Sequence, residues 1–215
     1  RYENRLRKFG YSPETLGWGK QGRQEVRFGV LAAPILDSLI SSVLDVGCGF
    51  ADFYDYLISR GWHGNYLGID IVPGLLQIAK ERHPFVDLRE LDITGEHFSL
   101  EKYDYVVASG VFNAKLKSGN NPEFIEWGLR NMYGIANRAI CLDFMSTYVD
   151  FQHPDAWHTD PAWAFALAKK LSRRVVLRHD YMPFEFAIII FCDDVISPRN
   201  VFQAIDDKIE LGKFP

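Results

Sequence analysis

The feature that most restricts the fold of this chain is a short apolar run that leads directly into two closely spaced glycines. Residues 42–46 predict a buried strand, Gly47 and Gly49 predict a tight turn, and residues 51–60 have the apolar spacing of a helix that stops at Gly61. Glycine lets the backbone turn sharply and lets a ligand approach the main chain closely. The start of the helix that follows favours a carboxylate or phosphate group. This segment therefore predicts an α/β ligand-binding domain.

The rest of the chain alternates strands and helices. The sequence predicts strands at 42–46, 65–70, 86–91, 103–109, 138–144, 174–179 and 185–192, and helices at 23–33, 51–60, 73–83, 122–136 and 161–171. Such alternation is typical of a parallel sheet that is covered on both faces. The link at 180–184 is too short for a crossover helix, so the last two strands should be antiparallel neighbours. We expect a doubly wound, Rossmann-like α/β fold: a seven-stranded, mainly parallel sheet with an antiparallel last strand and helices on both faces.

The 215 residues fit a single domain without an internal boundary. Within it, residues 1–40 are expected to form an N-terminal lid or helical segment and residues 41–215 the core. The first part of the chain places Tyr2, Phe9, Tyr11 and Trp18 among glycines and charged residues. Aromatic side chains in such a setting favour a segment that folds over a pocket.

Composition excludes several classes of function. The net charge of -4 and the lack of a basic stripe argue against a nucleic-acid partner. No apolar run is long enough to span a bilayer, and the three cysteines have no metal-binding spacing, so we expect a cytoplasmic protein without membrane or metal. Strand 103–109 ends in Ser109 where a catechol-type metal site would want an acid, and Asp143 is interpreted as a local hydrogen-bond acceptor.

Acidic residues recur at the ends of the first three predicted strands. Asp45 lies two residues before Gly47, Asp70 ends the second strand 23 residues after Gly47, and Asp92 follows the third strand. In an open α/β sheet, ligands bind at the carboxyl ends of the strands, and an acid after the second strand commonly holds ribose hydroxyls. Asp92 could accept from an adenine amino group while an apolar neighbour packs on the ring.

These segments, in this order, resemble the class I S-adenosylmethionine-dependent methyltransferases of small-molecule type over about residues 40–192. The resemblance implies that Asp45, Gly47 and Gly49 cradle the methionine end of the cofactor, that Asp70 binds ribose and that Asp92 faces adenine. The chain departs from the family at Ala51, where a third glycine is frequent. Further expected cofactor contacts are Cys48, Ile71, Ile93, Ser109, Trp18 and Arg27, the last as a bidentate donor to the cofactor carboxylate.

The acceptor should bind beyond the fourth and fifth strands, where its nucleophile can align with the activated methyl group. Expected substrate contacts are Tyr11, Phe112, Asn113, Tyr148 and His158. His153 is the candidate general base for an alcohol or phenol, unless both histidines simply bind loop backbone. Residues 111–115 do not follow the Asn-Pro-Pro-aromatic pattern of amide and amine methylation on macromolecules. A small-molecule acceptor is therefore expected, and its oxygen, nitrogen or carbon nucleophile is left open, as is the oligomeric state.

Three other functions share parts of this pattern. A Rossmann NAD(P)-dependent oxidoreductase also has a glycine turn, but its fingerprint needs a small residue where Asp52 stands, and an acid there would repel a pyrophosphate. A non-catalytic cofactor-binding partner protein would keep the same residues. Aminopropyl transfer would call for an acidic pocket after the fourth strand, which residues 109–112 do not supply.

Overall fold

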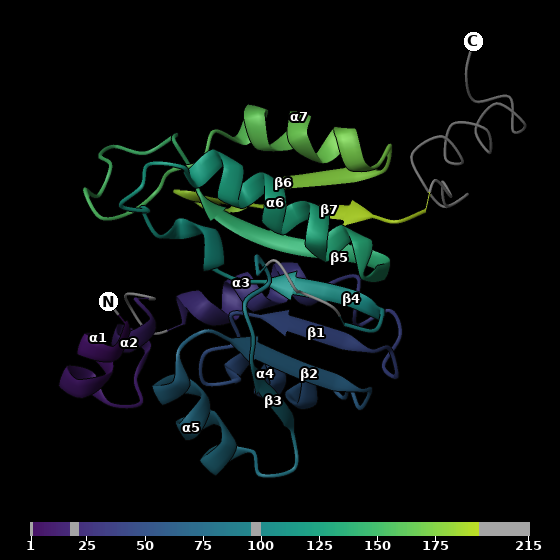
Figure 1. Ribbon diagram of the computed structural model, residues 1–215. Coiled ribbons are helices and arrows are strands. Elements are labelled where there is room, and N and C mark those ends of the chain that lie inside the picture. Colours follow the sequence, from purple (N-terminus) through teal and green to yellow (C-terminus); the bar gives the residue numbers. More distant parts are fainter. Residues whose placement is uncertain (1, 18–21, 96–99, 194–215) are drawn as a thin grey trace, which may run out of the picture.

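The computed structural model describes residues 2–17, 22–95 and 100–193, and a seven-stranded sheet lies at its centre (Figure 1). The strand order is β3-β2-β1-β4-β5-β7-β6. The strands are β1 (Val43–Val46), β2 (Tyr66–Asp70), β3 (Asp87–Glu90), β4 (Tyr103–Ala108), β5 (Ala136–Met145), β6 (Val175–Met182) and β7 (Glu185–Phe191). The helices are α1 (Tyr2–Phe9), α2 (Pro13–Leu16), α3 (Arg23–Ala32), α4 (Asp52–Ser59), α5 (Pro73–Arg82), the 3₁₀ helix η1 (Val111–Asn113), α6 (Asn121–Gly134) and α7 (Pro161–Leu171).

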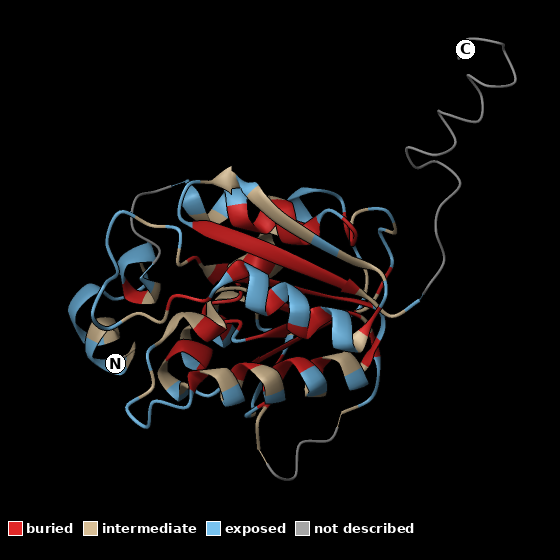
Figure 2. Ribbon diagram, turned by 90° about the horizontal axis from the view of Figure 1, so that it is seen from above, coloured by how far each residue is buried: buried red, intermediate tan, exposed pale blue. Residues whose placement is uncertain are grey.

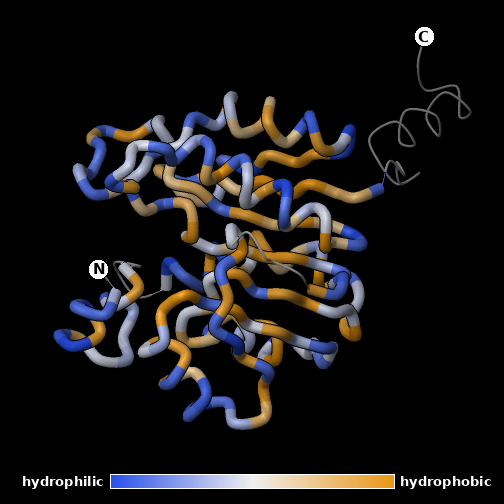
Figure 3. Tube along the Cα trace, in the orientation of Figure 1, coloured by the Kyte–Doolittle hydropathy of each residue, from blue (hydrophilic) through white to orange (hydrophobic). Residues whose placement is uncertain are grey.

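Helices cover both faces of the sheet, as predicted. Alternate residues of the central strands enter two separate cores: Val43 of β1 packs in the core that α3, α4 and α5 cover, whereas Leu44 packs in the core that α6 and α7 cover. Figure 2 shows the buried strands between helices whose outer sides are exposed, and Figure 3 shows the apolar residues gathered on the strands. Each face of the sheet thus carries its own core, as is typical of a mainly parallel sheet that helices cover on both sides.

The predicted antiparallel pair at the end of the chain is confirmed. β7 runs antiparallel to both β5 and β6, and it lies between them in the sheet. β6 continues to Met182, so only Pro183 and Phe184 connect it to β7. β1 pairs in parallel with β2 and β4, and therefore the first three acidic strand ends and the end of β4 meet along one edge of the sheet.

Some local features differ from the expectation. Ala136 was expected on the face of the 122–136 helix, but α6 ends at Gly134 and Ala136 begins β5, where it pairs with Tyr103 of β4. A lid or helical segment was expected at residues 1–40 without the bounds of α1 and α2, and η1 was not predicted. Helix α1 buries none of its residues, although Tyr2, Leu6 and Phe9 have the spacing of one helix face. In Figure 1, α1 and α2 lie beside α5.

Candidate functional site

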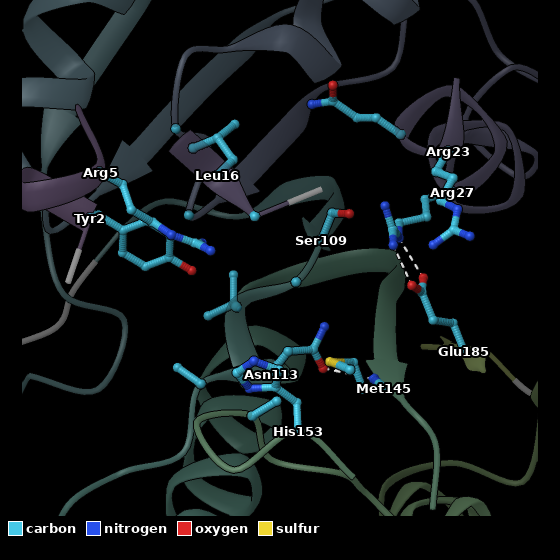
Figure 4. Close-up of a pocket in the computed structure, with 18 of the residues that line it drawn as sticks. Tyr2, Arg5, Leu16, Arg23, Arg27, Ser109, Asn113, Met145, His153 and Glu185 are labelled. Carbon is cyan, nitrogen blue, oxygen red and sulfur yellow. Dashed lines mark hydrogen bonds and ion pairs between the residues drawn. The ribbon is translucent and has the colours of Figure 1, made fainter. Parts of the chain in front are cut away.

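A cavity of about 610 Å³ lies at the carboxyl ends of the central strands. Its walls come from segments far apart in the sequence: α1 to α3, the turn after β1, the end of β2, the segment after β4, and the 145–158 loop together with the start of β7 (Figure 4). This volume lies within the range of small-molecule sites, and the position is where open α/β sheets bind ligands.

The turn at Gly47 and Gly49 lines the cavity, and its lack of side chains leaves room for a ligand. Gly47 and Gly49 have φ angles of 70° and 56°, and a Cβ on Gly47 would lie 2.5 Å from a methyl group of Val111. The amides of Gly47 and Cys48 donate to Ile69 O, and the amide of Gly49 donates to Asp70. These three amides thus serve the fold, and the glycines supply close approach for a ligand.

Two buried carboxylates flank the turn. Asp45 accepts a hydrogen bond of 2.6 Å from the Tyr66 hydroxyl, and burial raises its pKa to about 7. Asp70 accepts from the amides of Gly49 and Val72, each at 2.9 Å, and burial raises its pKa as well. Each Asp70 oxygen accepts one of these bonds and keeps capacity for a further donor. The site can therefore hold two hydroxyl groups at the end of β2.

A third buried acid organises the opposite wall. Asp143 of β5 accepts from the Ser109 hydroxyl at 2.5 Å and from the Gly110 amide at 2.7 Å, as expected of a local acceptor. Burial, together with the nearby charge of Glu185, raises the pKa of Asp143 to about 6, although Arg27 and the two hydrogen bonds oppose the shift. Asp143 thereby fixes the direction of the Ser109 hydroxyl, which lines the cavity.

Arg27 and Glu185 form a buried bidentate ion pair in the cavity wall (Figure 4). The pair joins α3 to the first residue of β7. Two nitrogens of Arg27, Nε and one terminal nitrogen, face Glu185 and not the open cavity. The sequence analysis missed Glu185, although an acid that starts an otherwise apolar strand is a detectable signal.

The polar side chains that follow β4 and β5 are held in place by hydrogen bonds with the backbone. The Asn113 side-chain oxygen accepts from the Met145 amide at 2.8 Å. His158 uses both ring nitrogens: Nδ1 lies 2.8 Å from Ser146 O, and Nε2 accepts from the His153 amide at 3.3 Å. The Nδ1 of His153 accepts from the Asp155 amide at 3.2 Å.

Of the expected site residues, the structure brings most to the cavity. Those that line it are Asp45, Gly47, Cys48, Gly49, Asp70, Ile71, Ser109, Arg27, Asn113, His153 and His158. Five others do not line it: Asp92, Ile93, Tyr11, Phe112 and Tyr148. Trp18 lies outside the described residues.

The five that do not line it have other surroundings. Asp92 accepts from the backbone and hydroxyl of Thr94, and Ile93 and Phe112 are core residues. Tyr148 is exposed. Tyr11 is exposed too, but it donates at 3.0 Å to Asp52, which does line the cavity.

Several apolar wall residues were not anticipated as site residues. They come from α2, the 145–158 loop and the β6–β7 connection, and they include Leu16, Met145, Val149, Phe151 and Phe184. Loop residues carry no periodicity that would reveal which way they point.

The described residues also lack two features that would change the class of this protein. They contain no group of three or more His, Cys, Asp or Glu side chains able to hold a metal ion. None of the helices in the described ranges is long and apolar enough to cross a membrane.

Sequence comparison relates this chain to methyltransferases. A family model described as a methyltransferase domain matches residues 43–133. The Mycobacterium tuberculosis protein named "Putative methyltransferase Rv1506c" is 33% identical over 154 residues, which cover 69% of this chain and 92% of that protein.

Solved structures agree in fold. The magnesium protoporphyrin IX methyltransferase of Synechocystis PCC 6803 with bound S-adenosylhomocysteine aligns with a TM-score of 0.63 at 16% identity and covers 89% of this chain and 94% of its own. A TehB-like S-adenosylmethionine-dependent methyltransferase of Corynebacterium glutamicum aligns with a TM-score of 0.62 at 18% identity, over 90% and 98% of the two chains. With its glycine turn, its acidic strand ends and these relatives, the chain belongs to the class I S-adenosylmethionine-dependent methyltransferases.

Proposed function

We propose that this enzyme methylates a small molecule and that it acts mainly by holding the acceptor's nucleophile in line with the methyl group. One observation carries the proposal. A single cavity joins the wall of Gly47, Gly49 and Asp70 to the wall of Asn113 and His153. A cofactor on the first wall and an acceptor on the second would then share one enclosed space.

The first wall fits the chemistry of S-adenosylmethionine. Asp70 has carboxylate capacity for two ribose hydroxyls, and Ile71, Val72 and Leu75 place apolar surface beside it for the adenine ring. The glycine turn leaves room for the methionine end, next to the carboxylate of Asp45. Bound there, the cofactor supplies a methyl group on positively charged sulfur.

The remaining cofactor contacts expected from the sequence stay predictions. They concern Cys48 and Ser109, which line the cavity, Asp92 and Ile93 at the end of β3, Trp18, and Arg27 as a donor to the cofactor carboxylate. Because Glu185 already engages the guanidinium of Arg27, a cofactor carboxylate would have to share it.

The chain's own residues then orient the acceptor and exclude water. Apolar side chains such as Val111, Met145 and Phe184 line the second wall, and a dry, aligned encounter favours methyl transfer. The acidic net charge and the enclosed cavity favour a small acceptor over a nucleic acid.

Calorimetric titration with S-adenosylmethionine, S-adenosylhomocysteine and NADH tests the first wall. We expect the two adenosyl ligands to bind and Asp70→Asn to weaken them by about ten- to a hundredfold, because charged hydrogen bonds worth roughly 1.5–3 kcal/mol are lost. Asp87→Asn, on exposed β3, is the matched control. Tight binding of NADH with no adenosyl binding would reject the placement.

A labelling experiment tests the size of the acceptor. A cell extract is incubated with the enzyme and S-adenosylmethionine carrying a radioactive methyl group, and it is then separated by size. Label in the small-molecule fraction supports the proposal, whereas label confined to protein or nucleic acid contradicts it.

A further inference from the structure

The acceptor side of the cavity presents hydrogen-bond donors, and this points to the charge of the acceptor. We propose that the nucleophile is an anionic oxygen, a carboxylate or phenolate on an apolar body, held by the side-chain N–H groups of Asn113 and His153. The inference rests on the proposed function, since it assumes a small acceptor opposite the glycine turn.

The orientation of the Asn113 amide is fixed. Its Oδ1 accepts from the Met145 amide at 2.8 Å, so the other end of the group must be the NH₂ donor. The residue itself is anchored in η1, where its backbone N–H donates to Gly110 O and its carbonyl accepts from the Trp157 amide. In Figure 4 the amide nitrogen points away from Met145 and toward the side of the cavity where Ser109 lies. Asn113 therefore turns its NH₂ donor, and not its Met145-bound oxygen, toward a ligand in the cavity.

His153 presents the same polarity. Its Nδ1 accepts from the Asp155 amide at 3.2 Å, so the neutral ring carries its proton on Nε2. His153 lines the same wall of the cavity as Asn113. In this tautomer Nε2 is a donor to the acceptor molecule, whereas a general base would need a lone pair there.

The acceptor groups on this side are already engaged. His158 has both ring nitrogens on backbone partners. Glu185 is paired with Arg27, and Asp143 accepts from Ser109 and Gly110. Asp150 also lines the cavity, but it is exposed at the rim, where water screens its charge. An ammonium group would thus find no buried, unengaged carboxylate among the described residues of this wall. An anion finds the half-buried NH₂ donor of Asn113, and the exposed His153 ring offers a second donor at the rim.

The rest of the wall fits an apolar body. The described apolar residues on this side are Val111, Ala114, Leu116, Phe124, Met145, Val149, Phe151, Ala156 and Phe184. A flat or extended hydrocarbon skeleton can bury its surface against them, and the two donors fix its polar end.

This assignment removes the need for a base. An oxygen lone pair forms the new bond to the methyl carbon, the bond from that carbon to sulfur breaks, and the electron pair stays on sulfur. The negative charge of the oxygen and the positive charge of the sulfur cancel, so no proton is transferred. A neutral alcohol or an ammonium acceptor would first have to lose a proton to a base.

Three probes with one skeleton test the charge. Cinnamate, cinnamyl alcohol and cinnamylamine are titrated calorimetrically into the protein saturated with S-adenosylhomocysteine. We expect cinnamate to bind about tenfold or more tightly than the amine, because charge-assisted hydrogen bonds to an anion are the stronger kind.

Asn113→Asp is the decisive variant. It retains an oxygen for the Met145 amide and replaces the NH₂ donor by a negatively charged oxygen. We expect cinnamate affinity to fall by about tenfold or more while S-adenosylhomocysteine affinity is unchanged. Asn120→Asp makes the same change seven positions along the chain at an exposed residue that does not line the cavity, and it should bind cinnamate like the wild type. His153→Leu should also weaken cinnamate.

The outcomes separate this inference from the proposed function. Two results would overturn the anionic-oxygen assignment. One is tighter binding of cinnamylamine than of cinnamate to the wild-type protein, and the other is full cinnamate affinity in Asn113→Asp. Binding of none of the three probes to protein that does bind S-adenosylhomocysteine would overturn it as well. Loss of S-adenosylhomocysteine binding itself would instead reject the proposed function.

Discussion

At the scale of single residues, Asp45 combines deep burial with a titratable charge. Its side chain is 3% exposed, and the ionised form lacks water. Asp70 and Asp52 raise its pKa further, and the hydrogen bond from Tyr66 only partly opposes the shift, so the pKa is about 7 compared with an ordinary 3.8. The folded protein therefore holds a proton on Asp45 at pH values where the unfolded chain has lost it.

This shift predicts a pH dependence of stability. Because the folded pKa is raised, the stabilisation from protonated Asp45 is complete below about pH 4 and is lost as the pH rises through about 7. Asp45→Asn removes this titration and can still accept from Tyr66. We expect the free energy of unfolding of wild type, relative to the variant, to fall between about pH 4 and pH 7 in urea titrations and to level off above that range. Asp180→Asn, at an exposed ion pair, is the control, and a constant wild-type-to-variant difference would contradict the shift.

The two histidines give a second test at this scale. His158 accepts from the His153 amide at Nε2, so its proton must sit on Nδ1, opposite Ser146 O. His153 carries its proton on Nε2. Nitrogen-15 spectra of the imidazole rings, assigned with His153→Gln and His158→Gln, should therefore show opposite neutral tautomers. A neutral His153 with its proton on Nδ1 would remove the argument that this residue donates from Nε2.

The sequence located the residues of the first wall better than those of the second. Gly47, Gly49 and Asp70 could be predicted because strand ends place them at one edge of the sheet. The polarity of Asn113 depends on a bond to Met145, 32 positions away, and Glu185 enters the site by pairing with Arg27 across 158 positions. Long-range partners of this kind leave no local periodicity in the chain.

At the scale of elements, local rules succeeded where one segment decides the outcome. The link between β6 and β7 is short, and shortness alone requires an antiparallel pair. The end of α6 was harder, because Ile125, Leu129, Met132 and Ala136 continue a helical spacing into β5. There the pairing of Ala136 with Tyr103 of β4 overrides the local pattern.

The contact between α3 and β7 carries a prediction of its own. Arg27→Met would leave the buried charge of Glu185 without its main partner, and we expect it to lower the free energy of unfolding by about 3–5 kcal/mol. Arg27→Met with Glu185→Met should recover much of that loss, since apolar side chains of similar volume fill the same space. Urea unfolding of both single variants and the double variant measures the coupling. Additive losses would mean that the pair does not join these elements.

At the scale of the whole molecule, the N-terminal helices close the cavity over the glycine turn. Leu16 of α2 packs on Gly49, where an added Cβ would lie 3.2 Å from its methyl group. Tyr11 anchors this segment: its hydroxyl donates to Asp52, and the Arg82 guanidinium lies 4.1 Å from its ring centre. These contacts join the start of the chain to α4 and α5, and the role of residues 1–40 as a lid stays a prediction.

A cofactor bound beneath such a lid must leave past it. Tyr11→Ala removes the anchor but no residue of the cavity wall, so we expect it to raise the dissociation rate of S-adenosylhomocysteine by about tenfold, since one hydrogen bond to a charged group and one cation–π contact are lost. Tyr11→Phe should give a smaller increase, because it keeps the ring under Arg82. Stopped-flow displacement measures both rates, and Phe85→Ala, an exposed aromatic outside the cavity, is the control. Unchanged dissociation in Tyr11→Ala would show that the cofactor leaves without moving α1 and α2, and residues 2–17 would then be a fixed wall of the site.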